Sequence, residues 1–389
     1  MTKKIFYSII ILLLFNSIKT NAQDTSFYEI PFTLNKQLLV FKGKLNNIDT
    51  DFAFDTGASI GVSNTKNEEN NGVVKQNKEI IAEDARQNTI KLTTALTKKL
   101  SIGGFDFENV VSSFIDMELL HCMNLYLLGS NIINQLNWEI DFNTKMLRVS
   151  KNPFRTNSSM KSFKVYYKSN IPRVSINING KNYTDVIVDF GYNGSIEIPK
   201  LNKKLSKILL NKYEKNEVEK KLSSAFVLGG LSNSYLEEIV CLDSLNLGDN
   251  SYKNVLVGFM ENTDFKIGLK FFLNNANKVI INNSTGTYHL ETRANPLTAS
   301  SFPMSVILKD DKFIVNSVRL YSDPNANLFK MNEELKSING KIPNDFKNRC
   351  DYLNWYYTSN LQKLIIEKLD GNKIELQKIS FFKKTSLNN

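Results

Sequence analysis

The chain has 389 residues, which is long enough for two or three ordinary domain cores. Its formal net charge of +10 comes from 49 basic and 39 acidic residues spread along the chain, without a basic cluster interleaved with aromatic residues. This pattern argues against a nucleic-acid-binding surface and indicates a lysine-rich solvated one. Three cysteines far apart in sequence give no disulfide framework, and two histidines without ligand spacing give no zinc site.

The first 22 residues have the pattern of a secretory signal peptide. Lys3 and Lys4 precede an apolar run over residues 5–15, and a polar stretch ends at Ala22. We expect cleavage after Ala22, which leaves a mature net charge of +7. The apolar run is too short to span a bilayer, and we find no longer one downstream. The sequence therefore predicts an exported, periplasmic or extracellular protein with no stable membrane insertion.

The first predicted hairpin ends in an aspartate. Alternating apolar residues over 38–45 and 48–55 flank a turn at Asn46-Asn47 and run into Asp55-Thr56-Gly57-Ala58-Ser59. Further along, Leu127-Leu128-Gly129 forms a short apolar segment that ends in glycine.

The same order recurs in the second half. Residues 173–178 and 181–189 flank Asn179-Gly180, a strong hairpin signal, and run into Asp189-Phe190-Gly191. The partner of the later segment is Lys266-Ile267-Gly268. Two aspartates at the ends of apolar strands, each followed by a glycine one residue later, predict a carboxylate pair that shares a proton and activates water without a metal or cofactor.

Further strands extend this internal repeat. Predicted strands at 100–105 and 108–111 recur at 245–249 and 253–257, and a final hairpin over 138–149 recurs over 278–290. Each half is mostly β, and residues 151–161 form a polar link. The second half has a predicted helix between Lys200 and Lys221, where the first half has a polar loop from Asn64 to Lys78.

These motifs carry a family resemblance. Asp55-Thr56-Gly57-Ala58 with Leu127-Leu128-Gly129 resembles the retropepsin-like aspartic peptidases, and the duplication resembles their two-lobed, single-chain bacterial members. The resemblance covers roughly residues 28–290. It implies two tandem β-barrel lobes, catalytic Asp55 and Asp189, and a cross-lobe hydrogen bond from Thr56. It also implies that Gly129 and Gly268 let neighbouring strands pass closely under the two loops.

The second loop departs from the family pattern. Phe190 stands where threonine or serine is usual and cannot supply a hydroxyl, and the bulky Tyr192 follows Gly191. We therefore weigh an active aspartic endopeptidase against a catalytically inactive peptide-binding protein on the same fold.

Two segments are candidates for a flap over the substrate. The first lies within residues 81–92 around Glu83 to Asn88, and the second spans residues 228–233 with Gly229 and Gly230. The glycines favour the second as the more mobile one.

The last hundred residues predict a third unit. A strand at 313–318, a short helix or turn at 325–329, a strand over 334–341 that ends in a turn, a helix within 351–362 and a hairpin around Asp370-Gly371 follow one another in an order that resembles a PDZ domain. The usual glycine-rich loop that binds a carboxylate is not evident, so capture of a chain terminus by strand addition is doubtful.

The predicted organisation is thus mainly β. It comprises a signal peptide (1–22), an N-terminal lobe (23–152), a C-terminal lobe (153–293) and a PDZ-like α+β domain (294–389). We expect a monomer that acts on peptide or protein substrates. A Cys–His nucleophile at His121 and Cys122 is a weak alternative, because adjacent strand residues point to opposite faces. Asp51 and Asp141 are expected to be exposed or turn residues.

Overall fold

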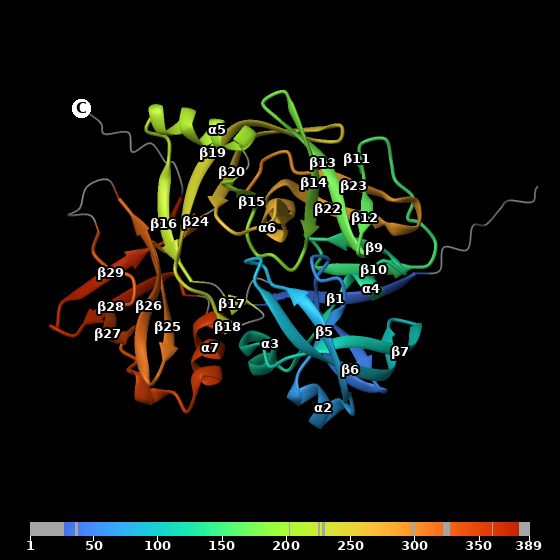
Figure 1. Cartoon of the computed structure of the whole chain (residues 1–389), viewed down its shortest axis with the longest axis horizontal. Helices are drawn as coiled ribbons and strands as arrows, with labels where there is room; N and C mark the ends of the chain where they lie inside the picture. Colours follow the sequence, from blue (N-terminus) through green and yellow to red (C-terminus); the bar gives the residue numbers. More distant parts are fainter. Residues whose placement is uncertain are drawn as a thin grey trace, which may run out of the picture.

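The computed structural model describes residues 27–35, 38–201, 203–224, 226–227, 230–297, 300–321, 327–359 and 361–380, and these are mostly β-strand (Figure 1). The predicted signal peptide lies outside the described residues. Within the described ranges, no helix combines the length and apolarity needed to cross a membrane.

Strands of the first half close into a six-stranded ring. The ring runs in the order β2 (Leu38–Leu45), β3 (Ile48–Phe54), β8 (Leu125–Leu128), β4 (Gly61–Ser63), β7 (Phe105–Phe114), β6 (Thr89–Ile102) and back to β2. The β3–β8 and β4–β7 pairs are parallel, and the others are antiparallel. The interior is apolar because alternate strand residues point inward.

Strands of the second half close in the same way. This ring runs β13 (Ile171–Ile178), β14 (Lys181–Asp189), β21 (Lys266–Gly268), β15 (Ile196–Pro199), β20 (Asn250–Met260), β19 (Tyr235–Leu247) and back to β13. The two parallel pairs of this ring, β14–β21 and β15–β20, match the parallel pairs β3–β8 and β4–β7 of the first ring. Both predicted Asp-bearing hairpins are confirmed as β2–β3 and β13–β14.

A third layer joins the halves. It runs β11 (Lys161–Lys164), β23 (Thr287–Thr292), β22 (Ala276–Asn282), β9 (Asn137–Asp141), β10 (Met146–Ser150) and β1 (Tyr28–Asn35). Ile140 of β9 pairs with Val279 of β22, so each half contributes its final hairpin to one continuous antiparallel sheet. Trp138 on β9 is fully buried in the core that this sheet covers.

Short helices follow the strands. They are α2 (Thr65–Asn71), α3 (Glu118–Met123), α4 (Ser130–Ile133), α5 (Lys203–Glu214) and α6 (Leu269–Asn275), and Asn283–Thr285 forms a single turn, η1. The predicted helix between Lys200 and Lys221 is the shorter α5.

Two local predictions were wrong. The stretch from Asn64 to Lys78 is not only a polar loop, because it contains α2 and the start of a strand. Asn64 and Asn67 cap each other's backbone at the start of α2, and Gly72 ends it with a positive φ of 63°. His121 and Cys122 lie on α3, not on a strand.

Each half also has a projecting hairpin. In the first half it is β5 (Val74–Glu83) with β6, and in the second β16 (Glu219–Ser223) with β19. Two short strands, β17 (Phe226–Val227) and β18 (Gly230–Leu231), pair beyond β16, and β12 (Tyr166–Lys168) pairs with β13.

The last unit, orange to red in Figure 1, has its own core. Its elements are β24 (Ser300–Ser301), β25 (Met304–Lys309), β26 (Lys312–Leu320), β27 (Glu334–Ile338), the turn η3 (Pro343–Asp345), α7 (Arg349–Thr358), β28 (Lys363–Lys368), β29 (Lys373–Gln377) and β30 (Ile379–Ser380). Of the predicted helix or turn at 325–329, residues 325 and 326 lie outside the described residues, and residues 327–329 form neither a helix nor a turn.

This unit is connected to both halves by strand pairing and by a disulfide. Strand β26 pairs with β16, which continues the second-half sheet, and a disulfide joins Cys122 on α3 to Cys350 on α7. The expectation that the cysteines form no disulfide network is corrected to one long-range bridge, with Cys241 as a free thiol. The bridge brings α3 and α7 together, although 228 positions separate its cysteines.

Candidate active site

Asp55 lies where β3 leaves the first-half ring. The three preceding residues, Phe52 to Phe54, are buried, and the Asp55 amide donates to the carbonyl of Leu128 (3.1 Å). The chain then turns sharply, so that the amides of Gly57 and Ala58 donate to Asp55 Oδ1 at 2.8 and 3.1 Å. These two donors fix the carboxyl group and stabilise its charged form.

Asp189 has the same environment at the end of β14. The amides of Gly191 and Tyr192 donate to its Oδ1, both at 2.9 Å. The two loops thus present their carboxyl groups with the same backbone hydrogen bonds, although the second loop differs in sequence.

The loops interlock through their glycines. A methyl group at Gly57 would overlap the Asp189 carboxyl, and one at Gly191 would overlap the Asp55 carboxyl. Each carboxyl group therefore lies directly against the opposite loop, close enough for each to shift the pKa of the other. Only glycine leaves room for this approach.

Thr56 makes a polar contact between the loops. Its buried hydroxyl donates to the carbonyl of Val188 (2.6 Å) and accepts from the amide of Phe190 (2.9 Å). The carbonyl of Thr56 in turn accepts from the Ser130 hydroxyl (2.8 Å).

Phe190 supplies aromatic packing at the position where Thr56 of the first loop supplies a hydroxyl. Its fully buried ring stacks on Phe272, with centroids 4.7 Å apart, and meets Phe54 of the other half edge-on at 5.8 Å. The side chain therefore fills the interface that it cannot hydrogen-bond across.

The Tyr192 ring does not lie between the aspartates. It packs on its own half against Gly194 and Gly268, where a side chain at either glycine would overlap it. Gly129 is equally restricted, because a methyl group there would overlap the backbone of Ile60 and Gly61. Ala58 and Ser59 continue the first loop, and the carbonyls of both accept backbone hydrogen bonds from the start of α4.

The carboxyl pair is electrostatically unequal. Burial, followed by the charge of Asp189, raises the pKa of Asp55 to about 8. Burial also raises the pKa of Asp189, but the Lys266 ammonium opposes that shift. Two carboxyl groups in contact cannot both ionise easily, so this pair retains a proton at neutral pH.

A polar cluster that the sequence analysis missed lies beside Asp189. Glu197 is buried and forms ion pairs with Arg86 (3.1 Å) and Lys266 (3.6 Å). The Lys266 ammonium lies over the Tyr192 ring, 4.7 Å from its centroid. A signal was present in the sequence, since Lys266 opens the segment that matches the purely apolar Leu127-Leu128-Gly129.

Arg86 belongs to the tip of the β5–β6 hairpin, the first predicted flap. Asp84 builds this tip by accepting from the amides of Arg86 (2.8 Å) and Asn88 (2.9 Å). The Arg86 guanidinium crosses to the second half, where it stacks on Tyr235 at 3.8 Å and pairs with Glu197. The hairpin therefore bridges the two halves.

The other predicted flap is described only in part. Gly229 lies outside the described residues, and Gly230 has a φ of 105°, which favours glycine. Its greater mobility stays a prediction.

The remaining candidates lie elsewhere. Cys122 is in a disulfide, which rules out the Cys–His nucleophile, and His121 faces Asp116 (3.3 Å). Asp141 accepts two turn amides, and Asp51 pairs with Lys42 at 2.8 Å.

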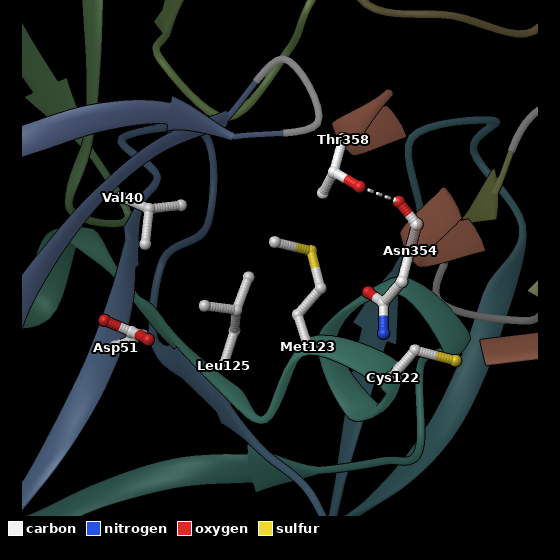
Figure 2. A pocket seen from close by; sticks show the side chains of 7 residues that line it. All are labelled: Val40, Asp51, Cys122, Met123, Leu125, Asn354 and Thr358. Atoms are coloured by element: carbon white, nitrogen blue, oxygen red, sulfur yellow. Dashed lines mark hydrogen bonds between the residues drawn. The ribbon is translucent and has the colours of Figure 1, made fainter. Parts of the chain in front are cut away.

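A separate hollow of about 200 Å³ is lined by the residues drawn in Figure 2. It lies between the first half and α7 and is lined by Val40, Asp51, Cys122, Met123, Leu125, Asn354 and Thr358. Neither aspartate of the pair lines it, so it belongs to the packing of the last unit against the first half.

Comparison with known proteins agrees with the first half of this site. A family model for aspartyl protease matches residues 41–132, under a quarter of the chain, including Asp55 and Gly129. No curated protein matches the chain.

Proposed function

We propose that the chain is an exported, two-lobed aspartic endopeptidase in which Asp55 and Asp189 share one proton and activate water against a peptide bond. The observation that carries the proposal is the reciprocal contact of the two carboxyl groups, each held by two backbone amides and each against the opposite glycine. The aspartyl protease match to residues 41–132 supports the same chemistry.

The geometry supports a direct attack by water. The carboxylate of the pair takes a proton from water as the water attacks the scissile carbonyl, and the carboxylic acid donates its proton to the developing oxyanion. Collapse of the tetrahedral intermediate then moves a proton to the leaving amine and returns the pair to its starting state. No metal, cofactor or covalent intermediate is needed.

The two closed rings with the same pairing order support two lobes, at 23–152 and 153–293, with the active site between them. An extended peptide would bind between the lobes and under the β5–β6 hairpin. The strands and the helix after residue 294 support a PDZ-like unit. We propose a monomer, because one chain carries both loops.

The disulfide between Cys122 and Cys350 supports export, because such bonds persist in oxidising compartments. This agrees with the signal peptide expected from residues 1–22.

One observation favours a second candidate, an inactive peptide-binding protein. The second loop has no hydroxyl at Phe190, so the contact between the loops depends on Thr56 from one side. A lobe that serves only as scaffold would tolerate this loss.

The test is cleavage of a mixed peptide library by the purified chain without residues 1–22, from acid to neutral pH. Asp55→Asn and Asp189→Asn variants are compared with Asp51→Asn, a control on β3 outside the pair. The proposal predicts cleavage by the wild type and by the control only. Retention of peptides without cleavage would instead support the binding protein.

A further inference from the structure

The two halves differ at one matched pair of positions beside the aspartates. In the first half Val62 of β4 pairs with Leu127 of β8, two residues before Gly129. In the second half Glu197 of β15 pairs with Lys266 of β21, two residues before Gly268. A buried apolar pair in one half is thus a buried ion pair in the other.

Lys266 is held on the Asp189 side of the pair. Its side chain is 6% exposed, and its ammonium lies 3.6 Å from Glu197 Oε1 and over the Tyr192 ring. The amide of this same Tyr192 donates to Asp189 Oδ1. The matching neighbours of Asp55 are Ala58, Val62 and Leu127, which carry no charge.

Glu197 keeps the ammonium in place. Its carboxylate is 1% exposed and also accepts from the Thr263 hydroxyl and the Arg86 guanidinium (3.1 Å). A buried carboxylate with this many partners is fixed in orientation, because leaving any partner costs an unpaired buried charge.

We propose that Lys266, held by Glu197, is a positioning residue that keeps Asp189 as the carboxylate of the pair and leaves the shared proton on Asp55. This assignment rests on the proposed peptidase function and adds the direction of proton transfer. A cation near one of two equivalent carboxyl groups stabilises the charge on that group, and the position near Asp55 that matches Lys266 is the uncharged Leu127.

The reaction then has fixed roles. Asp189 accepts the proton of the attacking water, and Asp55 donates its proton to the carbonyl oxygen, which gives a neutral gem-diol. As the C–N bond breaks, the proton on Asp189 passes to the leaving nitrogen, and a diol hydroxyl returns its proton to Asp55. Atoms and charge balance, and the starting state is restored.

Other titratable groups surround this cluster. They are Asp55, Arg86, Tyr192, Lys221, Tyr235, Glu237 and Lys270. Burial raises the pKa of Glu237 and lowers that of Lys270, so both shifts reduce the charge that these two groups add. Lys266 lies on β21, which pairs with the strand β14 that ends in Asp189, and its charge lowers the pKa of Asp189.

The test determines which of the two carboxyl groups ionises first as the pH rises. The titration is measured by ¹³C NMR on the mature chain, labelled at its aspartate carboxyl carbons. Asp55→Asn and Asp189→Asn variants assign the two signals. We expect Asp189 to ionise at lower pH than Asp55. In Lys266→Leu, which copies Leu127, the Asp189 titration should move up by about one pH unit or more.

Two further variants make the test specific. Glu197→Val with Lys266→Leu copies the whole apolar pair of the first half and avoids an unpaired Glu197, so it serves if the single variant does not fold. Lys212→Leu removes another buried, ion-paired lysine, on α5, and should leave both titrations unchanged.

An Asp55 that ionises first, or titrations unaffected by the loss of Lys266, would overturn the assignment. Because the titration needs no substrate, it decides the assignment even if the chain cleaves no peptide. Where cleavage occurs, the acid limb of the kcat/KM profile should move up with the Asp189 titration in Lys266→Leu and stay in place in Lys212→Leu.

Discussion

At the scale of single residues, the contact between the loops depends on Thr56. One hydroxyl serves both the carbonyl of Val188 and the amide of Phe190, while the Phe190 ring only packs. The resemblance implied a cross-loop hydrogen bond from Thr56. It did not reveal the stacking of Phe190 on Phe272, because this depends on a partner more than eighty residues away.

Thr56→Val should destabilise the fold by about 2–3 kcal/mol and reduce peptide cleavage, because the buried amide of Phe190 loses its acceptor. Chemical denaturation and kcat/KM measure the two effects. Thr56→Ser is the matched control. It should keep most of the stability and most of the cleavage activity, since it retains the hydroxyl. Equal losses in both variants would contradict a role for this hydrogen bond.

The raised pKa of Asp55 also predicts how stability depends on pH. From its ordinary value of 3.8 up to about 8, the folded chain holds a proton that the unfolded chain has lost. This group therefore lowers stability as pH rises through that window. Asp55→Asn should remove the loss and stabilise the chain at pH 7 by up to about 4 kcal/mol, with little change near pH 4. Thermal unfolding against pH measures this, and a parallel profile for variant and wild type would refute it.

At the scale of elements, local signals predicted the hairpins and missed what depends on distant pairing. Turn residues at Asn46-Asn47 and Asn179-Gly180 gave β2–β3 and β13–β14. The β9–β22 pairing that joins the halves has no local signal, because its strands are far apart in sequence. Helix α2 was missed because its asparagine caps, and not an apolar pattern, define it.

The β5–β6 hairpin is the element that bridges the two halves through Arg86. Arg86→Met keeps the aliphatic stem near Tyr235 and removes the charge that pairs with buried Glu197. We expect amide exchange at residues 84–88 to accelerate at least about tenfold, since the hairpin loses a buried ion pair.

Lys91→Met is the control for this experiment, because Lys91 pairs with Glu79 on the exposed face of the same hairpin. Its loss should leave exchange unchanged. Hydrogen–deuterium exchange with mass spectrometry resolves the segment. Equal exchange in Arg86→Met and wild type would mean that the cross-half contact does not hold the tip.

At the scale of the whole molecule, the last unit connects the halves. It continues the second-half sheet through β26–β16, and its helix α7 lies beside α3 of the first half (Figure 1), to which the disulfide joins it. The sequence analysis predicted its helix and strands β26 to β29 from local patterns, but not strands β24, β25 and β30. The disulfide was not, because cysteine count and spacing cannot identify a pair 228 positions apart.

The candidate site was also predictable only in part, because local motifs identify its aspartates and long-range strand pairing determines what surrounds them. Duplication of the hairpin and the Asp-x-Gly motif identified both aspartates in the sequence. The Glu197–Lys266 pair was visible as a departure from the repeat, but its meaning depends on β15 and β21 lying side by side next to Asp189. The two aspartates could be identified from the sequence alone, but the difference in charge between their surroundings could be seen only in the fold.

The most direct test is kcat/KM of Asp189→Asn on a peptide that the wild type cleaves. Asp185→Asn is the control, because Asp185 lies on the same strand, pairs with Arg173 at the surface and has a positive φ that asparagine accepts. The account predicts a loss of at least about a thousandfold for Asp189→Asn and less than about twofold for the control. A wild-type rate in Asp189→Asn would show that Asp55 acts without a partner in the second half and would contradict the shared-proton pair.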